Sequence, residues 1–319
     1  MLLSIVIPCY NSSRFIASTL DMLLLQGLHD SEVIIVNDGS KDETSEIVRK
    51  YKKKNPAIHL IDKQNEGVSI ARNTGLQAAS GKFIYFLDSD DALTNGTLNF
   101  YREILSAHPD NLFFAFGYYT EYCGKMLKDY AVEKFNGIVM NSLLLKQSFL
   151  SKKLCFHICS CIYESSFLRN NNICFTPGLR IGEDVEFLLK VFQFTPDCVY
   201  NSRHCFVYQI RDDSTMQGYK AFSEIHWHSY EVRRDLCLSE SYQTKNLKKY
   251  SNFFIQNEYL SHLIRYLKSD FNNSEISKNF VIDKKVMFLP SIYGKLKNCI
   301  AIKMAKLLPI KILLKNFKR

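Results

Sequence analysis

Three carboxylates follow an apolar run in the first third of this 319-residue chain. Residues 83–87 have the composition of a buried strand, and Asp88, Asp90 and Asp91 come directly after it. Acids at the end of a buried strand lie at the edge of a sheet, where ligands bind in open α/β folds. Asp88 and Asp90 are one residue apart, so both can reach one hard cation through oxygen. Such a cation would neutralise a diphosphate. The alternative is an ordinary acidic turn.

A second pair of acids, Glu183 and Asp184, precedes an apolar helical pattern. Both therefore belong to the first turn of a helix, where the helix dipole favours negative charge. From these residues alone, helix capping is the simpler interpretation.

The elements that must position these acids alternate between strand and helix over the first hundred residues. Continuous apolar runs predict strands at residues 3–7, 32–36, 58–61 and 83–87. Helices are expected from a Ser12 or Ser13 cap to about residue 26, from a Ser40–Glu43 capping box to residue 55, and over 68–79. This β-α-β-α-β-α-β order favours an α/β fold with a right-handed, mostly parallel sheet.

Two common nucleotide-binding folds lack support in the sequence. Asp38 ends the second strand, where a dinucleotide fold places its ribose-binding acid, but residues 8–12 contain none of the glycines of a pyrophosphate-binding turn. No phosphate-binding loop of the form Gly-x-x-x-x-Gly-Lys-Ser/Thr occurs either. A carboxylate-bound cation remains the available way to hold phosphates.

Several segments in order resemble the family 2 glycosyltransferases of GT-A fold. They are residues 4–11 (SIVIPCYN), 33–40 (VIIVNDGS), 65–67 (NEG) with 71–73 (ARN), and 88–91 (DSDD). Later segments, Glu183-Asp184 and Tyr208 to Thr215, extend the resemblance over about two-thirds of the chain. The resemblance implies an inverting enzyme that uses a nucleoside diphosphate sugar and a divalent cation, Mn²⁺ or Mg²⁺.

The resemblance also implies a role for each matched residue. On the donor side, Asp38 would accept a hydrogen bond from the base, normally uracil, and Asp90 would bind the metal directly. The other implied donor contacts are Pro8, Tyr10, Asn65, Arg72, Asp88, Ser89 and, over the diphosphate, Arg211. On the acceptor side, Asp184 would take the proton of the acceptor hydroxyl and Glu183 would orient the acceptor. Asp91 would be a supporting turn residue.

Composition is that of a soluble protein: 46% of residues are hydrophobic and the formal net charge is +9. Ten scattered cysteines favour reduced thiols and a cytoplasmic location. A cluster of Cys155, His157, Cys159 and Cys161 alternates along an expected strand, but no second ligand pair follows at zinc-site spacing. We find no leader peptide and no apolar stretch long enough to span a bilayer.

The last hundred residues differ from the rest. Residues 218–319 are expected to form a helical region, whose aromatic side chains would pack on the catalytic domain or form a homo-oligomer. From residue 290 onward there are eight basic residues and no acid. This amphipathic tail suits an anionic membrane surface, such as the inner face of the cytoplasmic membrane. A solvated tail with a packed apolar face is the alternative. No nucleic-acid-binding module accompanies the charge.

The sequence thus predicts a GT-A catalytic domain over residues 1–217 and a helical region over residues 218–319. We expect transfer of a hexosyl or N-acetylhexosaminyl group from a UDP-sugar to a hydroxyl of a glycan or lipid-linked glycan, as in lipopolysaccharide or capsule synthesis. Two alternatives stay open: a nucleotidyltransferase that makes sugar nucleotides, and a non-catalytic protein that binds nucleotide sugars.

Overall fold

The computed structural model describes residues 1–212 and 222–292, together with Ile302, Lys306, Ile310 and Leu314. It contains two compact units. The sheet unit comprises Met1–Ser142 and Phe156–Ile210, and the helical unit comprises Leu143–Cys155 and Arg211–Arg319. The boundary predicted between residues 217 and 218 lies outside the described residues.

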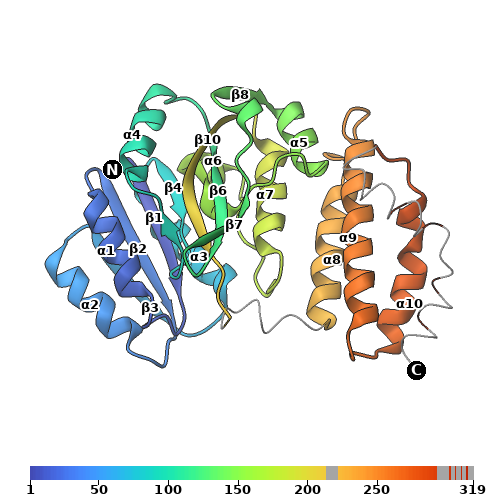
Figure 1. Cartoon of the computed structure of the whole chain (residues 1–319), viewed down its shortest axis with the longest axis horizontal. Coiled ribbons are helices and arrows are strands. Elements are labelled where there is room, and N and C mark those ends of the chain that lie inside the picture. The colour runs from blue at the N-terminus through green and yellow to red at the C-terminus, as the bar shows by residue number, and fades with distance from the viewer. Residues whose placement is uncertain (213–221, 293–301, 303–305, 307–309, 311–313, 315–319) are drawn as a thin grey trace. The chain divides into compact units, whose positions relative to one another are not determined.

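The sheet unit is built on strands in the order β3-β2-β1-β4-β9-β6-β10-β5, with β7 paired to β6 and β8 paired to β10 (Figure 1). The strands are β1 Leu3–Cys9, β2 Ser31–Asp38, β3 Ile58–Lys63, β4 Phe83–Phe86, β5 Ala92–Leu93, β6 Phe113–Tyr122, β7 Lys125–Asp129, β8 Ile138–Asn141, β9 Cys161–Glu164 and β10 Asp197–Gln209.

The first four strands form the parallel half of the sheet that the sequence predicts. β2 and β4 both pair with β1 in parallel, and β3 pairs with β2 in parallel. All residues of β1, β2 and β4 are buried, as expected for parallel strands covered on both faces. β9 is antiparallel to β4 and β6, whereas β6 and β10 are parallel. The expected α/β class is confirmed.

Helices connect these strands. They are α1 Ile16–Gln26, α2 Thr44–Lys54, α3 Val68–Ala78, α4 Thr97–Ala107, α5 Ser142–Leu150, α6 Ser165–Asn170 and α7 Glu183–Phe194. Right-handed crossovers in the strand order β3-β2-β1-β4 place α1 and α2 on one face and α3 on the other. α3 lies very close to β1, because a Cβ on Gly75 would stand 2.2 Å from a methyl group of Val6.

The predicted serine caps are wrong. α1 begins at Ile16 and α2 at Thr44, and neither has a side-chain hydrogen bond at its N-cap. The serines instead tie loops together at the carboxyl edge of the sheet. Ser12 N donates to Thr44 Oγ1 at 2.8 Å, and Asn11 N donates to Ser40 Oγ at 2.9 Å.

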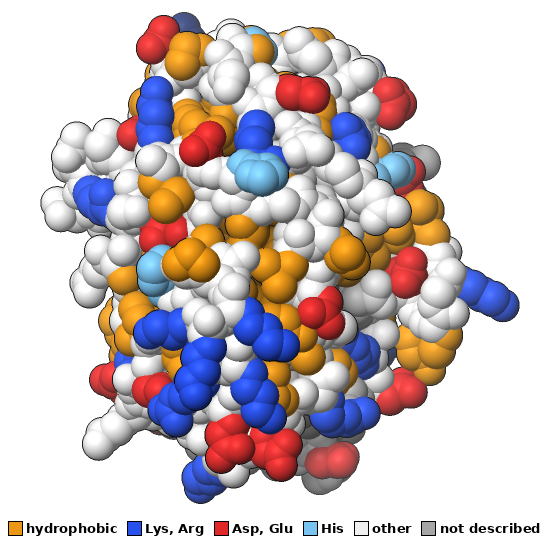
Figure 2. All heavy atoms as spheres, turned by 90° about the vertical axis from the view of Figure 1, so that its left-hand side faces the viewer, with side chains coloured by type: hydrophobic (Ala, Val, Ile, Leu, Met, Phe, Trp, Pro, Cys, Tyr) orange, Lys and Arg blue, Asp and Glu red, His pale blue; other side chains and the backbone are white. Residues whose placement is uncertain are grey.

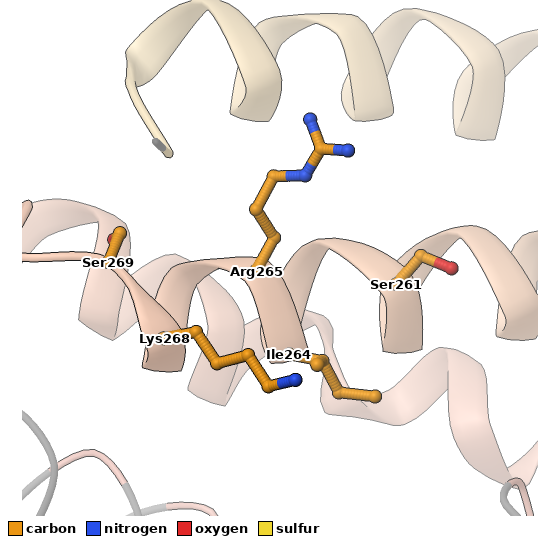
Figure 3. Close-up of a pocket in the computed structure, with 5 residues that line it drawn as sticks. All are labelled: Ser261, Ile264, Arg265, Lys268 and Ser269. Atoms are coloured by element: carbon orange, nitrogen blue, oxygen red, sulfur yellow. The ribbon is translucent and has the colours of Figure 1, made fainter. Parts of the chain in front are cut away.

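The helical unit contains α8 Glu224–Leu238, α9 Lys248–Lys268, α10 Ser274–Asp283 and the 3₁₀ helix Lys284–Phe288. Its core is aromatic: Phe222, Trp227, Tyr230, Tyr259, Tyr266 and Phe280 are all buried. A pocket on the surface of α9 is lined by Ser261, Ile264, Arg265, Lys268 and Ser269 (Figure 3). Its lining contains no carboxylate, and Arg265 Nη1 lies 2.9 Å from His226 Nε2 of α8.

A buried ion-pair network joins three segments of the helical unit. Glu258 of α9 lies 2.8 Å from Arg233 of α8 and 3.1 Å from Lys152, which follows α5. Burial by itself would raise the pKa of Glu258, but Lys152 and Arg233 outweigh it, so this pKa lies below its usual range.

Most of the basic tail lies outside the described residues. Ile302, Ile310 and Leu314 are helical and buried, which favours the packed apolar face among the two alternatives for these positions. In the part of the chain that the structure describes, no helix is long and apolar enough to cross a membrane.

A second basic region lies at the end of α2. Figure 2 shows Lys and Arg side chains gathered on this side of the molecule. The exposed basic residues of α2 are Arg49, Lys50, Lys52, Lys53 and Lys54. Arg49 pairs with Asp62 at 2.7 Å. Cations at the C-terminal end of a helix are favoured by its dipole.

We predict that Glu258→Gln lowers the free energy of unfolding by about 3 kcal/mol near neutral pH, because two cations lose their buried partner. The folded-state pKa of Glu258 lies below the unfolded value of about 4.3, so its contribution is full above that pH and is lost as the pH falls further. Urea unfolding should therefore show the gap between variant and wild type narrowing in acid. Exposed Glu240→Gln is the control, and an equal gap at every pH would contradict the prediction.

Candidate functional site

The acids after β4 lie at the carboxyl edge of the sheet, as the sequence predicts. Leu87 N still donates to Val6 O of β1 at 3.0 Å, and the chain then turns, with Asp91 N donating to Asp88 O at 3.2 Å. The turn begins where the pairing of β4 with β1 ends; Asp88 and Asp90 are half-buried in it, whereas Ser89 and Asp91 are buried.

Arg72 of α3 joins these acids to the second acid pair. Its Nη2 lies 2.8 Å from Asp88 Oδ1, and its Nη1 lies 3.1 Å from Glu183 Oε1. The Arg72 side chain is only 4% exposed, and its guanidinium lies over the ring of Phe175 at 5.2 Å. A planar guanidinium can serve two carboxylates at once, which an ammonium on a single flexible stem does less well.

The shared guanidinium affects the two carboxyl groups differently. Burial disfavours the charged form of Asp88, but Arg72 outweighs it, and the pKa of Asp88 lies below its usual value. Burial and the neighbouring Asp184 raise the pKa of Glu183, against the attraction of Arg72. Glu183 is thus the member of this group that is protonated more readily.

Asp184 lies beside Glu183 in the first turn of α7. The N-cap of the helix is Gly182, whose φ of +69° lies in the left-handed region that favours glycine. Tyr208, near the end of β10, interacts electrostatically with four carboxylates: Asp91, Asp88, Asp90 and Asp184. Burial is the main cause that raises the pKa of Tyr208 to about 12, and these carboxylates add to it. The structure therefore gathers the two acidic segments, about ninety residues apart in sequence, around one site.

Neighbouring elements hold the turn that carries the acids. The Ser89 hydroxyl is 2.8 Å from that of Ser12, and Thr19 Oγ1 donates to Ser89 O at 2.9 Å. Gln209 N donates to Asp91 Oδ1 at 2.9 Å, which ties the turn to β10. Ser89 is thus buried and engaged within the protein, and its predicted contact with ribose stays a prediction.

The Asp38 carboxylate organises the predicted base pocket. It accepts hydrogen bonds from Lys63 Nζ at 2.8 Å, Glu66 N at 3.0 Å and Gly67 N at 2.7 Å. Gly39 is required next to it, because a Cβ there would lie 2.7 Å from Asn65 N. Asp38 therefore holds the loop that carries Asn65 against the end of β2.

The remaining predicted donor contacts differ in exposure. Pro8 is buried within β1, whereas Tyr10 is 49% exposed and Asn65 is exposed. Arg211 is the first residue of this part of the helical unit, two positions after β10 ends. Its contact with a diphosphate stays a prediction, as do the roles of Pro8, Tyr10 and Asn65.

Among the residues that the structure describes, one group of side chains could share a metal ion: Asp88, Asp91 and Cys159, whose ligand atoms lie within 4.8 Å of one another. Two carboxylate oxygens suit Mg²⁺ or Mn²⁺. Burial raises the pKa of the Cys159 thiol well above its usual value, so the thiol favours its neutral form and is a poor ligand for a hard cation. This group does not include Asp90, the predicted metal ligand, and it includes Asp91, which the sequence favoured as a supporting residue.

His157 and Cys159 enter the site in a way that the sequence did not predict. The expected strand through their segment is interrupted, because Ile158–Ser160 forms a 3₁₀ helix and only Cys161–Glu164 is a strand. His157 Nδ1 accepts a hydrogen bond from Cys159 N, and the ring stacks on Phe206 of β10 at 4.9 Å. Burial lowers the pKa of His157 to about 4, so the ring is neutral near neutral pH. Hydrogen bonds from the backbone to the side chains of His157 and Ser160 favour this 3₁₀ turn over the expected strand.

Comparison with known families gives an independent result. The model of glycosyl transferase family 2 matches residues 4–167. This match covers the parallel half of the sheet and the acids after β4, but it ends before Glu183.

Individual proteins extend the similarity. The chain is 29% identical over 252 residues to an uncharacterized glycosyltransferase, EpsJ of Bacillus subtilis, covering 76% of this chain and 68% of EpsJ. It is 29% identical over 201 residues to TarS of Staphylococcus aureus, a poly(ribitol-phosphate) beta-N-acetylglucosaminyltransferase, covering 60% of this chain but only 32% of that protein. The crystal structure of S. aureus TarS 1–349 in complex with UDP-GlcNAc matches with a TM-score of 0.70 at 21% identity, covering 96% of this chain and 91% of that one.

Replacing Arg72 should affect both folding and the site. We predict that Arg72→Met lowers the free energy of unfolding by about 3 kcal/mol, because Asp88 and Glu183 are left without their buried cation. Arg72→Lys should lower the free energy of unfolding less, since lysine keeps the positive charge but lacks the two terminal nitrogens of the planar guanidinium. Urea unfolding measures both. Arg49→Met removes an exposed ion pair and should cost about 0.5 kcal/mol or less, so equal losses at the two arginines would contradict the prediction.

Proposed function

The chain belongs to glycosyl transferase family 2, and on this basis we propose that it transfers a sugar from a UDP-sugar to an acceptor hydroxyl with inversion at the anomeric carbon. The observation that carries the proposal is the Arg72 bridge, which brings Glu183 and its neighbour Asp184 to the acids that follow β4. Family membership also counts against the alternative of a nucleotidyltransferase.

Inversion needs two chemical groups on opposite faces of the sugar. One accepts the proton of the attacking hydroxyl, and the other stabilises the departing diphosphate. We assign the first role to Asp184, because it begins a different element, α7, from the turn that holds the donor. Glu183 is occupied by Arg72, so it would orient Asp184 and the acceptor rather than take the proton. General-base catalysis of this kind contributes about 10²–10⁴ to the rate.

The donor end of the site would consist of Asp38 and the loop it holds. A carboxylate beside a uracil ring can accept the hydrogen of the ring NH. Asp38 is buried, and the three donors that surround it fix its position. The complex of S. aureus TarS with UDP-GlcNAc supports a UDP-sugar as the donor, with N-acetylglucosamine as the first sugar to test. Arg211 would contact the diphosphate.

A divalent cation, Mn²⁺ or Mg²⁺, would be held by acids of the turn at residues 88–91. Asp90 is the ligand that the family pattern implies, and Asp88 and Asp91, whose carboxylate oxygens lie within 4.8 Å of each other, would supply further oxygen ligands. When bound, the cation would neutralise charge on the diphosphate of the donor. Arg72 would keep Asp88 ionised for this role, since it lowers the pKa of that carboxyl group.

The acceptor that we favour is a glycan or lipid-linked glycan of a bacterial surface polymer, such as lipopolysaccharide or capsule. The similarity to S. aureus TarS, a poly(ribitol-phosphate) beta-N-acetylglucosaminyltransferase, supports a polymer of this kind. Association with an anionic membrane surface fits the exposed lysines of α2, which would add to the basic tail. We propose a peripheral location at the cytoplasmic membrane. The protein should then co-sediment with anionic liposomes more than with neutral ones, and equal co-sedimentation with both would contradict the proposal.

The activity is tested by measuring UDP release from a panel of UDP-sugars with Mn²⁺, in the presence of candidate acceptors. We expect turnover of one donor, and a loss of about 10²–10⁴ in rate for Asp184→Asn, because the amide cannot accept the proton. Asp110→Asn, at an exposed acid of the sheet unit, should retain full activity. Undiminished turnover in Asp184→Asn would refute the assignment of the base.

Metal removal gives a separate prediction. We expect EDTA to abolish UDP release and Mn²⁺ or Mg²⁺ to restore it, because the diphosphate leaves with charge that a cation neutralises. Asp90→Asn should raise the Mn²⁺ concentration needed for half-maximal activity, and Cys159→Ser should leave it unchanged. A larger effect at Cys159 than at Asp90 would reverse our choice of ligands.

A further inference from the structure

The segment that leads into the acid pair has little structure of its own. Residues 171–182 contain no helix or strand. They end at Gly182, which has no side chain to cap α7. The buried face of α7 fixes the helix in the core, and side chains from other elements that bind this segment help to position its first turn, with Glu183 and Asp184.

Asn73 of α3 binds the segment through both atoms of its amide. Its Nδ2 donates to Phe175 O at 2.8 Å, and Phe175 N donates to its Oδ1 at 2.9 Å. One side chain thus satisfies the donor and the acceptor of one backbone residue. Among side chains of this length, only asparagine offers a donor and an acceptor in one plane; aspartate lacks the donor.

Three residues of one face of α3 contact the same stretch of chain. Ser69 and Asn73 are four positions apart, and Arg72 lies between them on that face. The Ser69 hydroxyl donates to Leu179 O at 3.2 Å, and Arg72 reaches Glu183. α3 therefore holds the segment near its start, in its middle and at the acid pair.

Contacts from α7 hold the segment in a different way. Thr176 Oγ1 donates to Glu186 at 2.9 Å, and Lys190 Nζ donates to Cys174 O at 3.0 Å. The Phe175 ring stacks on Phe187 of α7 at 4.1 Å with an interplanar angle of 6°. The rings of Phe175 and Phe187 also pack on Phe86 of β4, at 5.2 and 5.7 Å. The bonds from α3 add directional polar restraints to this apolar packing, and α3 also carries the arginine bound to Asp88.

We propose that Asn73 is a positioning residue, which holds Phe175 so that the Glu183–Asp184 pair lies at the correct place relative to Asp88. The proposal rests on the proposed function of that pair. The Asn73 amide bonds to the segment and not to the Asp38 loop, so its loss should affect the transfer step and leave nucleotide binding intact.

Kinetics separate this role from a general loss of stability. In Asn73→Ala and Asn73→Asp we expect kcat to fall about 10- to 100-fold, because small displacements of a catalytic group have effects of this size. The Kd for UDP, measured by calorimetry, should stay at the wild-type value. Thr74→Ala, one position along α3, removes a hydroxyl that bonds only within the helix and should retain wild-type kcat. A weaker Kd in proportion to the loss of kcat would overturn the proposal.

Hydrogen exchange tests whether Asn73 holds residues 173–182 in place, and it does not require activity. In Asn73→Ala, amides of residues 173–182 should exchange faster, with those of β1 and β2 unchanged. Unchanged exchange over 173–182 would overturn the proposal even if activity fell. Asn73→Ala could show faster exchange and a lower kcat while Asp184→Asn keeps full activity. In that case the positioning role of Asn73 stands and the assignment of Asp184 as the base fails.

Discussion

The candidate site depends on one buried guanidinium shared by two carboxylates. Arg72 binds Asp88, which ends the parallel half of the sheet, and Glu183, which begins α7. An arginine that is 4% exposed is tolerated because both of its terminal nitrogens are paired with acids. The cost of burying this charge is offset only when the two acidic segments are in place, so folding and the geometry of the site are coupled.

The fold supplies what this interaction needs. α3 approaches β1 closely at Gly75, which brings Arg72 over the edge of the sheet where the acidic turn emerges. The turn is in turn held by Ser12 and by Thr19 of α1, and by Gln209 of β10. Together with Arg72 of α3, which binds Asp88, four separate segments restrain it. A site that must position a donor and a proton acceptor within a fraction of an ångström benefits from such a rigid frame.

The sequence predicted the parts that follow from local pattern. Apolar runs indicated the parallel strands, and the acids after them were expected at the sheet edge. The contacts of Arg72 could not be predicted, because its partner Glu183 is more than a hundred residues away and a helix pattern carries no sign of that pairing. Cys159 was missed for a related reason: the side chains of His157 and Ser160 bond to nearby backbone NH groups and stabilise a 3₁₀ turn in place of the expected strand. Serine is a residue type that often caps helices, but Ser12 and Ser40 form hydrogen bonds between loops instead, with Thr44 and Asn11.

The central claim is that a carboxylate at the start of α7 and a diphosphate held at the acidic turn act on opposite faces of one sugar. The most direct test follows the anomeric proton by NMR while the wild-type protein consumes a UDP-α-linked sugar in the presence of Mn²⁺. We predict that the first product formed has the β configuration. A first product with the α configuration would show retention and refute inversion at this site.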